Sequence, residues 1–199
     1  MTICSFLINL IILLLIIFAP INSASAHLPV FKIGGVENIS RAQELFEILT
    51  AQMIFGRLQA GKTDFYKFKI SEPLNLHIQI LTPKRNNEFR PTLVILGPGL
   101  KKADEYFPFL IEEGLGAIVL ADNKTERETF FDFESLSRYF KGPETRRYLT
   151  EAGVYLLAVF EPKNNAGTYA IRLSDKEDWR PAAILNRIRG IFKIKLGLY

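Results

Sequence analysis

Apolar and polar residues alternate along two neighbouring stretches of the chain, a pattern typical of half-buried strands. In residues 66–70 aromatic and aliphatic side chains alternate with lysines, and in residues 74–80 four aliphatic side chains alternate with polar ones. Further apolar or alternating runs, bounded by Gly, Pro or Asn, cover residues 92–96, 116–121, 154–160 and 168–173. Regular short strands with turn residues between them predict an all-β fold, a jelly-roll-like antiparallel β-sandwich.

Helical periodicity is confined to the two ends of the region after residue 26. Ser40 and Gln43 have the spacing of a capping box, and apolar residues from Ala42 to Leu49 then fall on one face of a short N-terminal helix. After Pro181, a stripe with i, i+4, i+7, i+8 spacing predicts a C-terminal amphipathic helix. The stripe consists of Ile184, Leu185, Ile188, Ile191 and Phe192.

The first 26 residues have the pattern of an export signal. Residues 2–26 carry no charge, an apolar run covers residues 6–18, and Ala24-Ser25-Ala26 supplies the small residues that a signal peptidase accepts. Cleavage there would make His27 the new amino terminus. The alternative is an uncleaved membrane anchor, because the uncharged stretch reaches the ~20 residues that span a bilayer core. Either interpretation places the protein outside the cytosol: periplasmic, extracellular or attached to the non-cytoplasmic side of a membrane.

The chain after the signal suits one domain, over residues 27–179, with a separate tail over residues 180–199. Cys4 is the only cysteine and leaves with the signal, so the mature chain has no disulfide and no thiolate nucleophile. The core must therefore hold without disulfides.

The charge of the chain is concentrated in the tail. Residues 180–199 contain five basic residues and no acidic one, whereas the rest of the chain is nearly balanced. A basic amphipathic helix is typical of elements that lie on anionic membrane surfaces. An equally weighted alternative is a helix that docks its stripe on the sandwich and turns its bases to solvent. The predicted membrane-surface residues are Arg180, Ile184, Arg187, Ile188, Arg189, Ile191, Phe192, Lys193 and Lys195.

Several phrases resemble a known family. Residues 58–70 (LQAGKTDFYKFKI) look like the turn and aromatic-rich strand of bacterial pre-peptidase C-terminal (PPC) domains, and residues 166–173 (AGTYAIRL) look like the closing strand of that fold. Residues 27–31 and 90–100 are similar to a group of exported proteins that carry such a domain. The resemblance implies a β-sandwich that acts as an accessory to secreted proteins, in binding, folding assistance or surface attachment.

His27 and His77 are the candidate metal ligands. A histidine at a mature amino terminus can chelate Cu(II) through its α-amine and a ring nitrogen, and His77 would supply a second imidazole. Alternation puts His77 on the strand face opposite Leu76 and Ile78, where it can point to solvent instead. We therefore expect no cofactor, with copper as the alternative.

The remaining catalytic signatures are missing from the sequence. It contains no G-x-S-x-G nucleophile elbow, and adjacent carboxylates such as Glu112-Glu113 point apart along an extended chain. No basic sheet face interleaved with aromatics suggests nucleic acid. We therefore expect an exported, non-enzymatic module that binds a protein, a glycan or an envelope component, with possible membrane attachment through its tail; a copper-binding protein built on His27 is the alternative.

Overall fold

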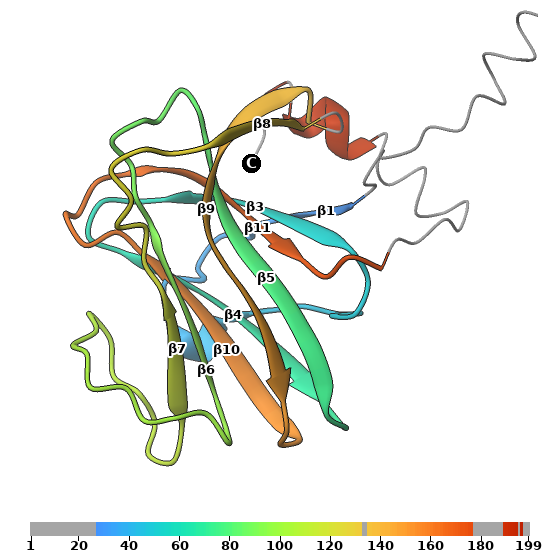
Figure 1. Cartoon of the computed structure of the whole chain (residues 1–199), viewed down its shortest axis with the longest axis vertical. Helices are drawn as coiled ribbons and strands as arrows, with labels where there is room; N and C mark the ends of the chain where they lie inside the picture. The colour runs from blue at the N-terminus through green and yellow to red at the C-terminus, as the bar shows by residue number, and fades with distance from the viewer. Residues whose placement is uncertain (1–26, 133–134, 177–188, 195, 197–199) are drawn as a thin grey trace, which may run out of the picture.

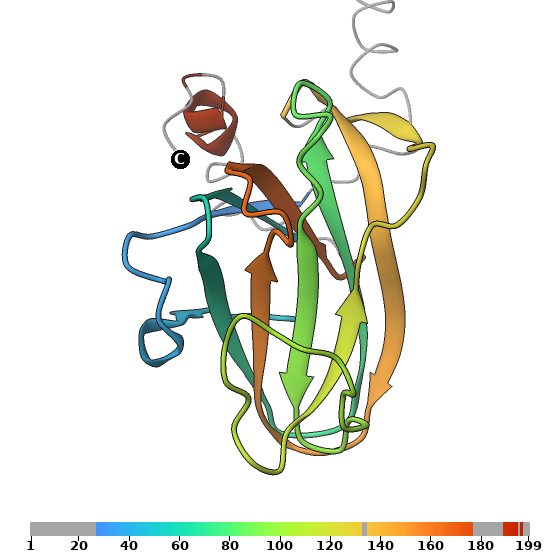
Figure 2. The same cartoon turned by 90° about the vertical axis from the view of Figure 1, so that its left-hand side faces the viewer.

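The computed structural model contains two β-sheets packed face to face (Figure 1). It describes residues 27–132, 135–176, 189–194 and 196, so the predicted signal and most of the basic tail lie outside the described residues. In Figure 2 the strands β4, β10, β6 and β7 of sheet B lie side by side across the view. The predicted all-β sandwich is therefore confirmed.

The larger sheet, sheet A, has six strands and carries the amino-terminal strand β1 at one edge. In spatial order its strands are β1 (Leu28–Phe31), β3 (Gln52–Leu58), β11 (Gly167–Leu173), β5 (Leu74–Pro83), β9 (Ser137–Leu149) and β8 (Thr129–Asp132). Sheet B has five strands and begins with β2 at one edge. Its strands in order are β2 (Gln43–Glu44), β4 (Thr63–Ile70), β10 (Gly153–Phe160), β6 (Thr92–Gly97) and β7 (Gly116–Leu120).

The six strands predicted from apolar patterning correspond to β4, β5, β6, β7, β10 and β11. The prediction of a fully antiparallel sandwich needs one correction. Both amino-terminal edge strands pair in parallel, β1 with β3 and β2 with β4. These short strands carry too few residues for a periodic signal, so the sequence pattern did not indicate their direction.

The predicted N-terminal helix is wrong. Residues Ile39–Arg41 form only a single turn of 3-10 helix, and the chain then enters β2. The turn begins at Asn38, whose side chain accepts the Ser40 N–H at 2.9 Å, so the Ser40 capping box does not form. Gln43 instead uses its side chain to hold β1.

The main core lies between the sheets and includes aromatic side chains from both. Tyr66 of β4 and Tyr169 of β11 are completely buried, and their hydroxyl oxygens are 2.7 Å apart. Phe68 stacks on Tyr155, with ring centroids 5.6 Å apart. Burial of such aromatic side chains is the dominant favourable contribution to folding.

Both sheets also carry apolar side chains on their outer faces. On sheet A, the outward Met53, Phe55 and Leu81 form a cluster against which Ile194 of the C-terminal helical segment packs. On sheet B, the outer cluster around Phe65 is covered by Phe107 and other residues of the loop that precedes β7. This loop and the helical segment lie at opposite ends of the sandwich (Figures 1 and 2).

Each sheet contains a glycine over which a tyrosine ring from the neighbouring strand lies. Gly56 of β3 is opposite Tyr169 of β11, and Gly97 of β6 lies against Tyr155 of β10. A Cβ atom at position 56 would overlap the Tyr169 ring. Only glycine leaves room for the ring in this position.

We predict that Gly56→Ala destabilises the fold by about 1–3 kcal/mol, because the new methyl group displaces Tyr169 and strains the core around it. The matched control is Gly34→Ala, since no atom lies within 4 Å of a Cβ built there. Denaturant unfolding followed by tyrosine fluorescence measures both variants. Equal stability of the two variants would contradict this account of the Tyr169 packing.

Candidate functional site

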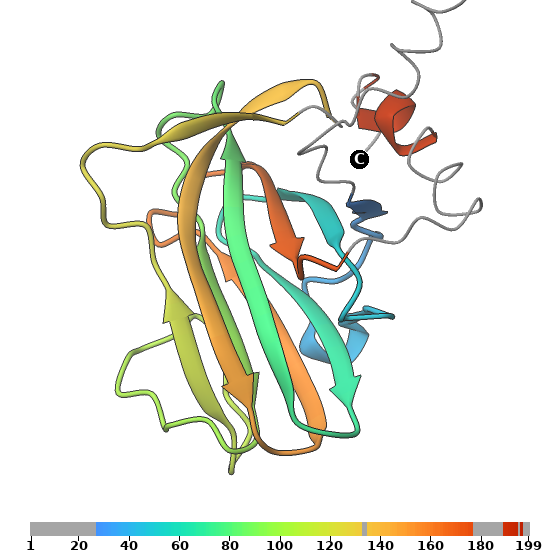
Figure 3. The same cartoon turned by 45° about the vertical axis from the view of Figure 1, so that its right-hand side comes forward.

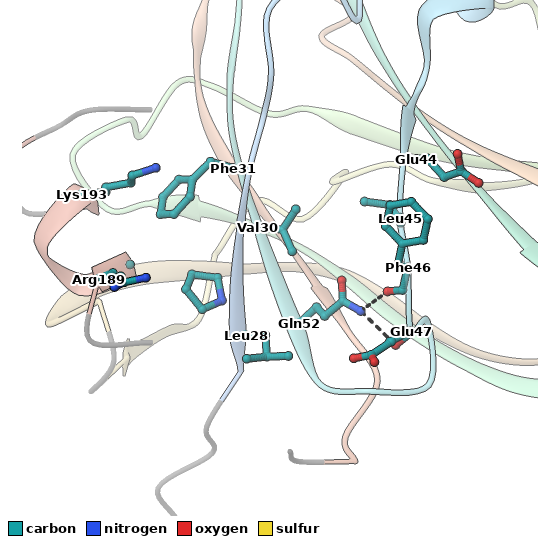
Figure 4. Close-up of a pocket in the computed structure, with 12 residues that line it drawn as sticks. Leu28, Val30, Phe31, Glu44, Leu45, Phe46, Glu47, Gln52, Arg189 and Lys193 are labelled. Carbon is teal, nitrogen blue, oxygen red and sulfur yellow. Dashed lines mark hydrogen bonds between the residues drawn. The ribbon is translucent and has the colours of Figure 1, made fainter. Parts of the chain in front are cut away.

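A pocket of about 420 Å³ opens at the edge of the sandwich where both amino-terminal edge strands lie (Figure 4). One wall is β1, the second is the segment that leaves β2, and the third is the helical segment at residues 189–194. The apolar part of its lining consists of Leu28, Val30, Phe31, Leu45 and Phe46. A concave site with a mostly apolar lining and a few charged groups is the usual form of a ligand-binding site.

Gln43 closes the free edge of β1. Its side-chain amide donates to the Phe31 carbonyl at 3.0 Å, and its side-chain oxygen accepts the Ile33 N–H at 2.9 Å. One side chain thus makes the two bonds that a neighbouring strand would make. Pro29, earlier on the same strand, has no N–H to leave unpaired. Both features protect an edge strand from pairing with other chains.

A second glutamine fixes the opposite wall of the pocket. The Gln52 side-chain amide donates to the carbonyls of Phe46 and Glu47, at 2.6 and 2.9 Å. Glu47 has a positive φ of 52°, which turns the chain at this point. The turn leaves Phe46 with 69% of its surface exposed at the mouth of the pocket.

The helical segment sits directly on β1. A Cβ atom at Gly190 would overlap the Pro29 ring, so the glycine permits a very close approach. Lys193 lies over the Phe31 ring, with its ammonium 5.1 Å from the ring centroid. Figure 3 shows the segment beside the end of β1. The docked arrangement that the sequence offered as an alternative is thus present for these residues.

The outward face of the same segment is both basic and apolar. Arg189 and Lys193 are exposed, and Phe192 and Leu196 between and beyond them keep 65% and 69% of their surfaces exposed. Ile191, predicted for the membrane face, is half-buried. The predicted residues Arg180, Ile184, Arg187, Ile188 and Lys195 lie outside the described residues. Among the described residues, no helix is long and apolar enough to span a bilayer.

The two histidines belong to one polar cluster on sheet A and its edge, but each has other partners. His27 is buried, and its Nε2 accepts a hydrogen bond from Arg172 Nε at 3.0 Å. The His77 Nδ1 lies 2.9 Å from the carboxylate of Asp175. Arg172 in turn lies 3.4 Å from Asp175, so two intervening side chains connect the histidines.

This arrangement does not favour copper on both histidines. A guanidinium occupies the Nε2 side of His27, and the His77 Nε2 lies 3.4 Å from Glu144. Within residues 27–132, 135–176 and 189–196, apart from position 195, no three His, Cys, Asp or Glu side chains gather as a metal site. Copper at a mature His27 stays a prediction.

Asp175 organises this cluster, although its sequence context gave no signal. Burial acts to raise the pKa of Asp175, but hydrogen bonds from Arg146 and His77 outweigh it and hold that pKa below its ordinary value. The Arg146 guanidinium lies 2.8 Å from the carboxylate. Asp175 follows β11 and Arg146 belongs to β9, so only the sheet order brings them together.

Comparison with solved structures finds several similar chains. The chain is similar to the pre-peptidase C-terminal domain of collagenase from Bacillus anthracis, with 17% identity, a TM-score of 0.41, and coverage of 67% of this chain and 95% of that one. It is also similar to the Yersinia pseudotuberculosis-derived mitogen, with 12% identity, a TM-score of 0.38, and coverage of 67% and 92%. No protein-family model and no curated protein matches the sequence. The first of these structures is a PPC domain, the kind of domain that residues 58–70 and 166–173 resemble.

We predict that Asp175→Asn makes the free energy of unfolding less sensitive to a fall in pH. Because the folded pKa of Asp175 is lowered, its contribution is present above the ordinary carboxyl pKa and is lost as the pH falls through the lowered value. Unfolding free energies measured between about pH 6 and pH 2 should therefore fall more steeply in the wild type. Asp104→Asn, at an exposed position, is the control, and an identical pH profile for Asp175→Asn and wild type would refute the prediction.

Proposed function

We propose that the chain is an exported, non-catalytic β-sandwich module that attaches to an anionic membrane surface through the outward face of its C-terminal helical segment. The observation that carries the proposal is the exposure of Phe192 and Leu196 beside Arg189 and Lys193. Large apolar side chains gathered with bases on one helix face are typical of interfacial helices. We call these four residues the basic apolar face.

Docking on the sandwich and binding to a membrane are compatible here. Gly190 and Ile194 lie on the side of the segment that contacts the sandwich, against Pro29 and the outer cluster of sheet A. Phe192 and Leu196 keep their exposure to solvent, while Arg189 and Lys193 lie at the rim of the pocket, exposed although Lys193 also contacts the Phe31 ring. The segment therefore presents a fixed surface rather than a free tail, and binding requires no ordering of these residues.

The charges around the pocket orient the proposed contact. Arg189 and Lys193 lie on one rim, and Glu44 and Glu47 lie on the opposite rim (Figure 4). An anionic surface attracts the first rim and repels the second, so the helical segment approaches the lipid while the β2 side tilts away. Three further bases, Arg180, Arg187 and Lys195, are close to this segment in the sequence. The apolar pocket beside this rim fits an aliphatic or aromatic group of an envelope component.

The proposal predicts binding to vesicles that contain phosphatidylglycerol and little binding to phosphatidylcholine vesicles. Neutralising the bases with Arg189→Gln and Lys193→Gln should lower the partition coefficient at least about tenfold at low salt, since each base near the surface contributes about 1 kcal/mol. Phe192→Ala with Leu196→Ala should weaken binding by removing the apolar contact. Vesicle sedimentation of the purified protein measures both effects.

The control is Tyr106→Ala with Leu110→Ala, because these side chains are 95% and 92% exposed on the loop at the other end of the sandwich. Unchanged partitioning of this control together with weakened partitioning of the two tail variants supports the proposal. Equal partitioning of wild type and tail variants, or no preference for anionic lipid, overturns it.

A further inference from the structure

A buried amine and a buried carboxyl group meet beneath the edge of the sandwich, away from the basic apolar face. Lys32 directly follows β1 and Asp64 belongs to β4, so the two residues come from different sheets. The Lys32 Nζ lies 2.6 Å from Asp64 Oδ1. The Asp64 side chain is completely buried, and that of Lys32 is 11% exposed.

A second carboxylate lies beside the Lys32 amine, and a hydroxyl group lies beside the second oxygen of Asp64. The Glu37 carboxylate lies 3.3 Å from the Lys32 Nζ. The Tyr169 hydroxyl donates to Asp64 Oδ2 at 2.8 Å and is itself 2.7 Å from the Tyr66 hydroxyl. The carboxyl carbon of Asp64 thus has an amine at one oxygen, a hydrogen-bond donor at the other, and a second carboxylate that reaches the amine.

Burial disfavours the charged form of the Asp64 carboxyl, while the Lys32 Nζ also donates to the Arg57 carbonyl at 3.0 Å. Burial raises the pKa of Asp64, against the hydrogen bonds from Lys32 and Tyr169. Ions removed from water lose hydration that one short contact does not fully replace. Transfer of one proton from Lys32 to Asp64 along their hydrogen bond gives a neutral amine beside a neutral carboxylic acid. Glu37 remains a carboxylate, because a hydrogen bond from its own backbone lowers its pKa.

We propose that Lys32 and Asp64 condense to an intramolecular isopeptide bond that joins the two sheets. The Lys32 amine attacks the Asp64 carboxyl carbon, and the electron pair of the C=O bond moves onto Oδ2, where the Tyr169 hydroxyl stabilises it. Glu37 takes a proton from the Lys32 nitrogen and delivers it to the Oδ1 hydroxyl. Oδ1 leaves as water, the C=O bond at Oδ2 re-forms, and a neutral amide remains.

The reaction balances without a co-reactant. One amine and one carboxylic acid give one amide and one water molecule, and Glu37 ends in the state in which it began. Contact at hydrogen-bond distance in a site that excludes water supplies the proximity that free amines and acids lack in solution. Formation of the amide also removes a charged pair from the core, which contributes to the driving force.

The proposed amide would fasten an edge of the sandwich that no disulfide can fasten. β1 is the edge strand of sheet A and has only β3 as a strand partner. With no cysteine after Cys4, the sandwich has no disulfide to fasten this edge. An amide between Lys32 and Asp64 would fasten it covalently to sheet B and would resist reduction.

Intact-mass spectrometry of the purified, denatured protein tests the proposal. We expect a mass lower by one water molecule than the sequence from its measured amino terminus requires. Trypsin should release one branched peptide, in which the amino-terminal peptide ending at Arg41 is joined to residues 63–67. No Lys or Arg precedes Lys32, so the same peptide reports where the mature chain begins.

Lys32→Arg keeps a positive charge beside Asp64 and should show the full mass, and trypsin should release residues 63–67 as a separate linear peptide. Glu37→Gln should slow the reaction and leave a mixture of linked and unlinked chains, because the proton carrier is lost. Lys62→Arg, at a neighbouring exposed position, is the control and should lose one water molecule as the wild type does. Full mass for the wild type, or loss of water that persists in Lys32→Arg, overturns the proposal.

Discussion

Both sheets of this sandwich are apolar on two faces, and this constraint determines where the other parts of the chain lie. The inward faces meet in the main core, but Met53 and Phe55 of sheet A and Phe65 of sheet B point the other way and are buried as well. Each outer cluster therefore needs a cover of its own. The loop before β7 covers one, and the C-terminal helical segment contributes to the cover of the other.

This constraint connects fold and proposed function. The segment that completes the outer cluster of sheet A also shapes the edge pocket and exposes the basic apolar face. Its apolar positions thus divide between packing and exposure: Ile194 contacts the sandwich while Phe192 and Leu196 face solvent. A helix that had only to cover the sheet would have no need of large apolar residues on its outer side.

The sequence predicted the architecture well and the edges poorly. Six strands follow from alternation and turn residues. The sequence did not predict β3 and β9, although both lie inside sheet A. The predicted helix after Ser40 does not form, because Gln43 instead hydrogen-bonds to the backbone at the end of β1. This long-range contact cannot be recognised from helical spacing in the sequence. The partners of His77 and Lys32 were equally hidden, since Asp175 and Asp64 come near only through sheet order and register. Tail bases, by contrast, were visible from composition alone.

The contact between Gly190 and Pro29 joins the first described strand to the last described segment. Ribosomes make the amino-terminal end first, so β1 exists long before the residues that will pack on it. During that interval the outer side of sheet A, with Met53 and Phe55, lacks part of its cover. A nascent or truncated chain would therefore expose an apolar surface that the helical segment helps to cover in the folded protein.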